Sequence, residues 1–174
     1  MNQNHIIYDI ESILVPIEKT VGKQTLKNQH HLLSIGAVAY INGNYFSFFE
    51  AISDMTKGAK MNIVRDFLSF CKTQTEKIEI PTEILVLIEN LEEEYEINER
   101  SPDKSLITSK IRQLKRLITV PIFGFNSQKY DLKILIDKLL VCFSEMYEVK
   151  KINILKRGTN FFNIDTPGTV MCCV

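Results

Sequence analysis

The sequence has no excess of charge of either sign. Lys and Arg together number 21, as do Asp and Glu, so the formal net charge over 174 residues is zero. A strongly basic chain would indicate a nucleic-acid partner over much of its surface, so here such contact has to be local. Two basic runs could supply it, although runs of this kind are more often solvated faces. They are Lys110, Arg112, Lys115 and Arg116, and Lys150, Lys151, Lys156 and Arg157.

The sequence also lacks a long apolar run and any CxxC pair. No stretch approaches the roughly 20 apolar residues of a membrane-spanning helix, and residues 1–5 have neither region of a signal peptide. The four cysteines, Cys71, Cys142, Cys172 and Cys173, favour a reducing compartment. We therefore expect an intracellular protein with no membrane partner. Its content of 45% hydrophobic and 24% charged residues predicts one globular domain.

The first part of the chain has the pattern of a three-stranded meander. Apolar residues 5–10 predict a buried strand, which we expect to end in a loop from Pro16 to about His30. Residues 32–41 and 45–49 are β-prone, and the Asn-Gly-Asn sequence between them is typical of a tight hairpin turn. These strands should therefore pair in antiparallel order.

Predicted helices and short strands make up the rest. Apolar residues spaced by three and four predict helices at 62–71, 105–117 and 130–141, and the first should pack on the sheet. Residues 75–104 have the composition of a helical insertion with an acidic outer face.

The later strands are short. Residues 120–126 predict a strand in which Pro121 fits near the start. Residues 152–155 and 161–164 predict a last hairpin, whereas residues 166–174 indicate no further element. The pattern as a whole predicts an α/β fold.

Two acidic stretches follow apolar runs and are candidates for a shared site. Asp9 and Glu11 come at the end of the first predicted strand, where alternate residues share one face, so Tyr8 and Ile10 should point to the other side. Asp131 lies where a strand gives way to a helix. Carboxylates gathered closely repel one another unless divalent cations lie between them, and oxygen ligands favour Mg²⁺ or Mn²⁺. The pattern therefore predicts a two-metal site for phosphodiester hydrolysis.

Each stretch also has an ordinary structural interpretation. A D-x-E triplet often arises by chance and could be an exposed strand end. Asp131 could stabilise the N-terminus of a helix, with Asn126 and Ser127 in capping and turn positions. The occurrence of both stretches in one chain shifts the balance toward a site.

Both stretches resemble motifs of DEDD-type 3′–5′ exonucleases. Asp9-Ile10-Glu11 after an apolar strand is similar to the first motif. Residues 124–132, Gly-Phe-Asn-Ser-Gln-Lys-Tyr-Asp-Leu, resemble the second motif in the form found in protein-primed family-B DNA polymerases. These are enzymes of linear plasmids, certain viruses and self-synthesising transposons. The predicted order of strands and helices is similar over nearly the whole chain.

The resemblance implies an RNase H-like fold, with a mixed sheet that contains an antiparallel meander and is flanked by helices. It implies that Asp9, Glu11 and Asp131 are the catalytic metal ligands, for Mg²⁺ or Mn²⁺. Ser12, Asn126 and Tyr130 take the positions of residues that contact single-stranded DNA in the family.

The implied function is that of the exonuclease portion of a DNA-directed DNA polymerase, which removes nucleotides from single-stranded 3′ ends during DNA replication. A polymerase domain and a terminal protein would be partners of the full-length enzyme. The implied location is the cytoplasm, or the mitochondrion for a plasmid-borne enzyme.

The sequence departs from the family pattern in two places. The fourth carboxylate, expected in a Tyr-x-x-x-Asp motif, is missing, because neither Asp137 nor Asp165 has the required setting. The polymerase palm is also absent. We therefore expect residues 1–174 to form a single, truncated exonuclease-type domain. Binding of the second metal should be weak and the domain weakly active or inactive alone, because metal ligands act as a unit.

Three other interpretations stay open. The chain could be a non-catalytic nucleic-acid-binding module of the same fold, a stand-alone DEDD exonuclease acting on DNA or RNA, or a structural α/β domain with accidental acids. Phe46, Phe48 and Phe49 could stack on bases, although a hydrophobic strand explains two of them more simply.

Overall fold

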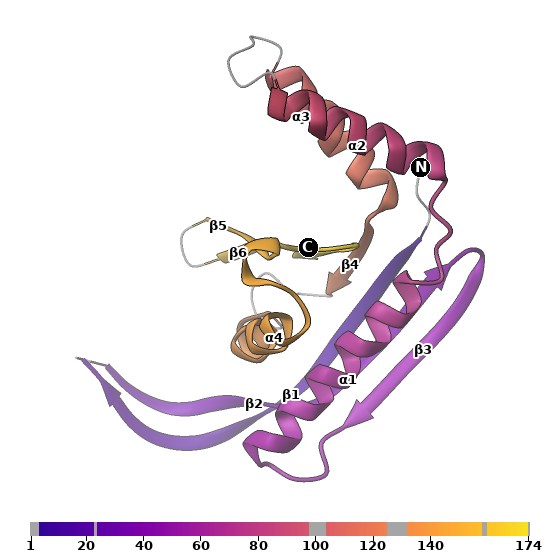
Figure 1. The fold of residues 1–174 in the computed structure, drawn as a ribbon. Coiled ribbons are helices and arrows are strands. Elements are labelled where there is room, and N and C mark those ends of the chain that lie inside the picture. Colours follow the sequence, from indigo (N-terminus) through magenta and orange to yellow (C-terminus); the bar gives the residue numbers. More distant parts are fainter. Residues whose placement is uncertain (1–3, 23, 98–103, 125–131, 158–159, 174) are drawn as a thin grey trace.

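The structure, a computed structural model, describes residues 4–22, 24–97, 104–124, 132–157 and 160–173. Within them, a mixed seven-stranded sheet has the order β3-β2-β1-β4-β7-β6-β5 (Figure 1). The strands are β1 (His5–Val21), β2 (Gln24–Ile41), β3 (Asn44–Ala51), β4 (Val120–Gly124), β5 (Asn153–Arg157), β6 (Asn160–Thr166) and β7 (Thr169–Cys173). The helices are α1 (Lys57–Thr75), α2 (Thr82–Ile97), α3 (Lys104–Ile118), α4 (Leu132–Met146) and the short 3₁₀ helix η2 (Val149–Lys151).

Strands β1, β2 and β3 form the predicted antiparallel meander. The turn between β2 and β3 contains Asn42 and Gly43, which have φ angles of 50° and 82°. These two residue types adopt the left-handed region with the least strain, so the chain can reverse direction within two residues. The turn fixes a register in which Gly36 of β2 lies opposite Phe49 of β3.

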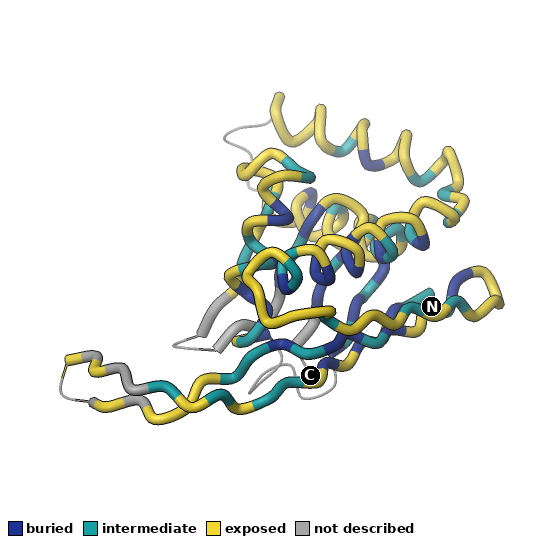
Figure 2. The backbone as a smooth tube through the Cα atoms, turned by 90° about the horizontal axis from the view of Figure 1, so that it is seen from below, coloured by how far each residue is buried: buried dark blue, intermediate teal, exposed yellow. Residues whose placement is uncertain are grey.

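The hairpin of β1 and β2 is much longer than predicted, and the expected loop from Pro16 to about His30 is wrong. Beyond Glu11 the two strands stay paired as far as Val21 opposite Gln24. This outer part, residues 12–22 and 24–31, projects from the sheet as a two-stranded arm (Figures 1 and 2). Proline cannot donate a ladder hydrogen bond, and the pairing register shifts just after Pro16. The strands therefore accommodate the proline instead of ending at it.

Parallel pairing joins the meander to the rest of the sheet. Ile6 pairs with Ile122 of β4, and Ile122 pairs in turn with Met171 of β7. The prediction of no element after residue 166 is therefore wrong, because β7 occupies the interior of the sheet between β4 and β6. Gly168, with φ of 82°, makes the turn from β6 into β7, and the predicted last hairpin is confirmed as β5 and β6.

Helices α1 and α4 cover one face of the sheet, which we call the inner face. Phe67 of α1 and Leu135 of α4 are both fully buried in one core cluster with Tyr8 of β1. The Tyr8 and Phe67 rings have centroids 5.3 Å apart. Helix α1 begins earlier than predicted because Thr56 caps it: its side-chain oxygen accepts a hydrogen bond from the amide of Ala59.

Helices α2 and α3 form a hairpin that leaves the sheet (Figure 1). Ile88 and Ile107 are its buried residues, and neither belongs to the main core cluster. Helix α2 lies within the range predicted to be an acidic helical insertion, and α3 confirms the helix predicted at 105–117.

The predicted fold class is confirmed. The described residues form an α/β fold whose mixed sheet contains an antiparallel meander and is flanked by helices, consistent with an RNase H-like architecture. None of the helices in the described segments has the length and apolar character needed to cross a lipid bilayer.

Candidate functional site

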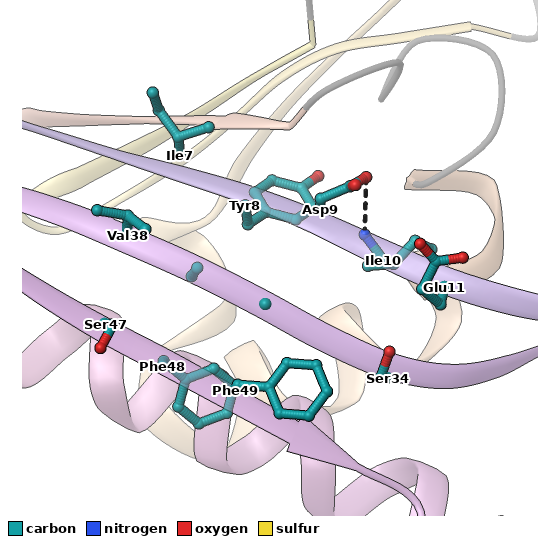
Figure 3. A pocket seen from close by; sticks show the side chains of 12 residues that line it. Ile7, Tyr8, Asp9, Ile10, Glu11, Ser34, Val38, Ser47, Phe48 and Phe49 are labelled. Carbon is teal, nitrogen blue, oxygen red and sulfur yellow. Dashed lines mark hydrogen bonds between the residues drawn. The ribbon is translucent and has the colours of Figure 1, made fainter.

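Asp9 and Glu11 lie on the outer face of the sheet, the face opposite to α1 and α4. Along β1, Tyr8 and Ile10 are 2% and 8% exposed, whereas Asp9 and Glu11 are both exposed to solvent. This alternation is what the sequence predicts for a strand with one covered face. Figure 3 shows both carboxylates leaving β1 on the same side.

The two carboxylates line an open groove across β1, β2 and β3. Its volume is about 580 Å³, within the size range of small-molecule and nucleotide sites. Apart from the acids the groove is mostly apolar, with Ile7, Val38 and Phe49 along it (Figure 3). These three side chains are 47%, 46% and 75% exposed. The groove therefore has acidic side chains at one end and apolar side chains along its floor.

Strand register explains the shape of the floor. Gly36 lies opposite Asp9 on one side and opposite Phe49 on the other, and Ser34 lies opposite Glu11. A Cβ at Gly36 would come within 3.8 Å of the Phe49 ring. Glycine at this position leaves the space between carboxylate and ring open. Sequence reasoning did not assign Ser34 or Gly36 to the site, although the Asn-Gly turn and the period of two could have placed them there.

The backbone beside Asp9 is tied to its side chain. The amide of Ile10 donates a hydrogen bond to Asp9 Oδ1 at 3.0 Å. Such a bond limits the rotation of the Asp9 carboxylate, whereas Glu11 forms no hydrogen bond or ion pair with the described residues (Figure 3). The two predicted ligands therefore differ in how firmly they are held.

Ser12, predicted to contact DNA, lies at the base of the arm instead of on the groove floor. Its hydroxyl is 3.2 Å from His30 Nδ1, across the β1–β2 pair. The neighbouring His31 accepts a hydrogen bond from Lys60 Nζ at 2.7 Å. Burial, and then the charges of Lys60 and Lys138, lower the pKa of His31, so the ring stays neutral and can accept that bond. The Lys60–His31 bond fastens the base of the arm to α1.

The other three predicted site residues, Asn126, Tyr130 and Asp131, lie outside the described residues. The described positions on either side are informative. Gly124, at the end of β4, pairs in parallel register with Tyr8, the residue before Asp9. Leu132, at the start of α4, is 1% exposed in the core. Strand β4 thus ends beside the residue that precedes Asp9, and α4 begins in the core.

The donor chemistry of the site fits a hard divalent cation. Asp9 and Glu11 offer exposed carboxylate oxygens from one rigid strand, and oxygen ligands suit Mg²⁺ and Mn²⁺. Among the described residues there is no group of three or more His, Cys, Asp or Glu side chains that could hold a metal. The described part of the site therefore contributes two carboxylate ligands, half of the four that the DEDD-type motifs imply.

Neither acid considered for the fourth ligand lies in the groove. Asp137 is exposed on α4, which packs against the inner face. Asp165 of β6 pairs with Val170 of β7, and β6 is three strands away from β1, or about 14 Å at the usual strand spacing. Burial raises the pKa of Asp165, and its Oδ1 has no hydrogen-bond partner among the described residues. It is a partly buried carboxylate of the sheet, separate from the pair on β1.

The predicted basic patches do not border the groove where they are described. Lys115 of α3 is 2.6 Å from Glu92 of α2, in the hairpin that leaves the sheet. Lys150 and Lys151 of η2 pair with Glu148 at 2.8 and 3.7 Å. These three lysines therefore form exposed ion pairs, the ordinary role of surface charge.

Comparisons with known proteins do not name a family for the chain. No protein-family model matches it, and no curated protein or solved structure was found to match. The strand order and the carboxylate pair on β1 are the observations from which a function has to be inferred.

Proposed function

We propose that this chain is an exonuclease-type domain whose outer groove receives the 3′ end of a single DNA strand. The observation that carries the proposal is the pairing of two exposed carboxylates, Asp9 and Glu11, with an apolar floor that ends in Phe49. The acids would hold Mg²⁺ or Mn²⁺ against the terminal phosphodiester. The apolar floor would contact the bases.

The roles within this proposal follow from the chemistry of each group. Asp9, restrained by the Ile10 amide, is the fixed ligand, and Glu11 is the adjustable one. Ions held there would supply Lewis-acid activation of the attacking water and stabilisation of the leaving oxygen. Phe49 offers a 75%-exposed ring, and stacking on an aromatic ring contributes about 1–3 kcal/mol per base.

The finer assignment rests on the motif at residues 124–132. On that basis the domain belongs to a protein-primed family-B DNA polymerase, with Asp131 as third metal ligand and Asn126 and Tyr130 as DNA contacts. It would support DNA replication by removing 3′-terminal nucleotides. Two described ligands bind a metal pair weakly, so the isolated chain should turn over slowly.

The test is release of the 3′ nucleotide from labelled single-stranded DNA in the presence of Mn²⁺. We expect slow release that Asp9→Asn and Glu11→Gln each abolish, while the control Glu79→Gln, an exposed acid outside the groove, leaves the rate unchanged. Mn²⁺ binding measured by titration calorimetry should weaken at least tenfold in both site variants. Release that survives both substitutions, or Mn²⁺ binding that neither one affects, would overturn the proposal.

The exposed ring of Phe49 favours one second candidate, a module that binds single-stranded nucleic acid without cleaving it. The same assay distinguishes the two functions when it is combined with fluorescence anisotropy of a labelled strand. Salt-dependent binding that Phe49→Ala weakens, together with no cleavage at any Mn²⁺ concentration, would establish the second function. Cleavage lost in Asp9→Asn would establish the first.

A further inference from the structure

Charge is completely segregated between the two helices of the α2–α3 hairpin. Every charged side chain on α2 is acidic and every one on α3 is basic. The acids are Glu83, Glu89, Glu92, Glu93, Glu94 and Glu96, and the bases are Lys104, Lys110, Arg112, Lys115 and Arg116. The chain as a whole has no net charge, so the separation of charge on the hairpin does not reflect an overall excess of either sign.

The hairpin also exposes apolar side chains that a solvated pair of helices does not need. Leu85, Val86 and Leu87 are 46%, 47% and 47% exposed, and they belong to a run of five apolar residues from 84 to 88. Leu106 and Leu117 of α3 are 55% and 51% exposed. A helical segment that is apolar on all sides, as residues 84–88 are, is normally buried on more than one side. Here α3 covers only one side of α2.

Apolar and charged side chains share the same sides of these helices. Leu106, Lys110 and Leu117 recur at spacings of four and seven, so they lie along one side of α3. Glu83 and Leu87 share a side of α2 by the same rule. Each helix therefore presents leucine next to charge, and the sign of the charge is opposite on the two helices.

The contacts within one hairpin use only part of this complementarity. Lys115 pairs with Glu92 at 2.6 Å, and Lys104 lies over the Tyr95 ring at 4.3 Å from its centroid. A partner for the remaining surface must be basic where it meets α2, acidic where it meets α3, and apolar between. A second copy of the same hairpin has all three properties when the two are related by a twofold axis.

We propose that the α2–α3 hairpin is a dimerisation surface, on which α2 of one chain packs against α3 of a second copy and the reverse. Such an interface is isologous, with the same patch used twice. It buries the exposed leucines between four helices and places acidic α2 opposite basic α3 at both crossings. Opposite charges flanking an apolar seam are also what selects partners in paired helices. The proposal is independent of the activity at Asp9 and Glu11.

The first test is the mass of the full chain in solution, measured by sedimentation equilibrium at low and high salt. We expect twice the mass of one chain at low salt and a weaker dimer at high salt, because exposed charge pairs are screened. Leu87→Gln should weaken the dimer at least tenfold without changing the circular dichroism spectrum. A monomer up to the highest soluble concentration, or a dimer that Leu87→Gln leaves intact, would overturn the proposal.

The second test exchanges charge between chains. One variant cancels the net charge of α2 (Glu83→Lys, Glu89→Lys, Glu93→Lys), and the other makes α3 acidic (Lys110→Glu, Arg112→Glu, Arg116→Glu). Each variant alone should be monomeric, because acidic α2 no longer meets basic α3 at either crossing. The first variant has three Lys and three Glu on α2, and the second has three Glu and two Lys on α3. An equimolar mixture should form a one-to-one heterodimer.

A control variant changes charge by the same amount away from the hairpin, at exposed Glu50, Asp66 and Asp137, each replaced by Lys. It should dimerise like the wild-type chain. Circular dichroism establishes that every variant keeps its helices. Folded charge variants that do not pair with each other when mixed, or that each still dimerise alone, would exclude this surface.

Discussion

The two faces of the central sheet differ sharply although they are built from alternate residues of the same strands. On β1, Ile6, Tyr8 and Ile10 point inward and are buried, whereas Asp9 and Glu11 point outward into solvent. The inner face packs on two helices, and the outer face forms an open groove. A substitution on the inner face should therefore change the folding free energy strongly, whereas one at the neighbouring residue on the outer face should change it little.

The largest expected effect is on the inner face. Phe67 is fully buried, with ring centroids 5.3 Å from Tyr8 and 6.0 Å from Phe48. Phe67→Ala should lower the free energy of unfolding by about 3–5 kcal/mol, because it removes a large buried side chain and leaves a cavity. Urea unfolding measures this. A loss below about 1 kcal/mol, the range of surface changes, would mean that the inner core is not packed as described.

Stabilisation by a metal ion should depend on residues of the outer face and not on residues of the inner face. At a Mn²⁺ concentration ten times the dissociation constant, a bound ion stabilises the folded state by about 1.4 kcal/mol. We expect this gain in thermal unfolding of the wild-type chain and of Phe67→Ala, but not of Glu11→Gln. Equal stabilisation of all three proteins would place the ion somewhere other than the groove.

The carboxylates on β1 and the carboxylate on β6 differ in burial, and stability should depend on pH accordingly. Asp9 and Glu11 are exposed, whereas Asp165 is half-buried and burial raises its pKa. The unfolded chain then releases this proton at lower pH than the folded chain does, so stability falls as pH rises from the usual Asp pKa through the raised one.

Asp165→Asn should remove that loss and stabilise the protein at neutral pH by on the order of 1 kcal/mol, the scale of an unpaired buried acceptor. Unfolding curves from pH 3 to pH 7 test the sign, with Asp66→Asn, an exposed acid on α1, as the matched control. An advantage for Asp165→Asn that shrinks as pH rises would contradict the burial of this carboxyl.

The smallest effect should come from Phe49→Ala, the same substitution as at Phe67 but on the outer face. Because the Phe49 side chain is 75% exposed, its removal should change the free energy of unfolding by no more than about 0.5 kcal/mol. Urea unfolding under identical conditions provides the direct contrast. A cost as large as that of Phe67→Ala would show that this face is covered in solution.

Much of the fold could be predicted because its signals are local. The Asn42-Gly43 turn fixes the β2–β3 hairpin, and apolar spacing identifies α1, α3 and α4. The period of two on β1 also predicts correctly that Asp9 and Glu11 share the exposed side. In each case a short stretch of sequence contains all the physical information that is needed.

What could not be predicted depends on partners distant in sequence. Strand β7 is only five residues long and is defined by pairing with β4 and β6. A loop was predicted from Pro16 to about His30, yet β2 pairs with β1 on both sides of the proline. The Asn42-Gly43 turn sets Gly36 opposite Phe49, but the register that also sets Gly36 opposite Asp9 depends on the pairing of β1 with β2, which no single segment specifies.

The arm has one more consequence for how the molecule comes apart. Two paired strands without a helix over them are only marginally stable in water, whereas the strands at the base of the arm belong to the seven-stranded sheet. Amide deuterium uptake should therefore be fast around Gly22 and slow progressively toward Ile10. A protease should be able to cut near the tip while the rest of the protein stays folded. Local unfolding should therefore begin at the tip of the arm and stop where the arm joins the sheet.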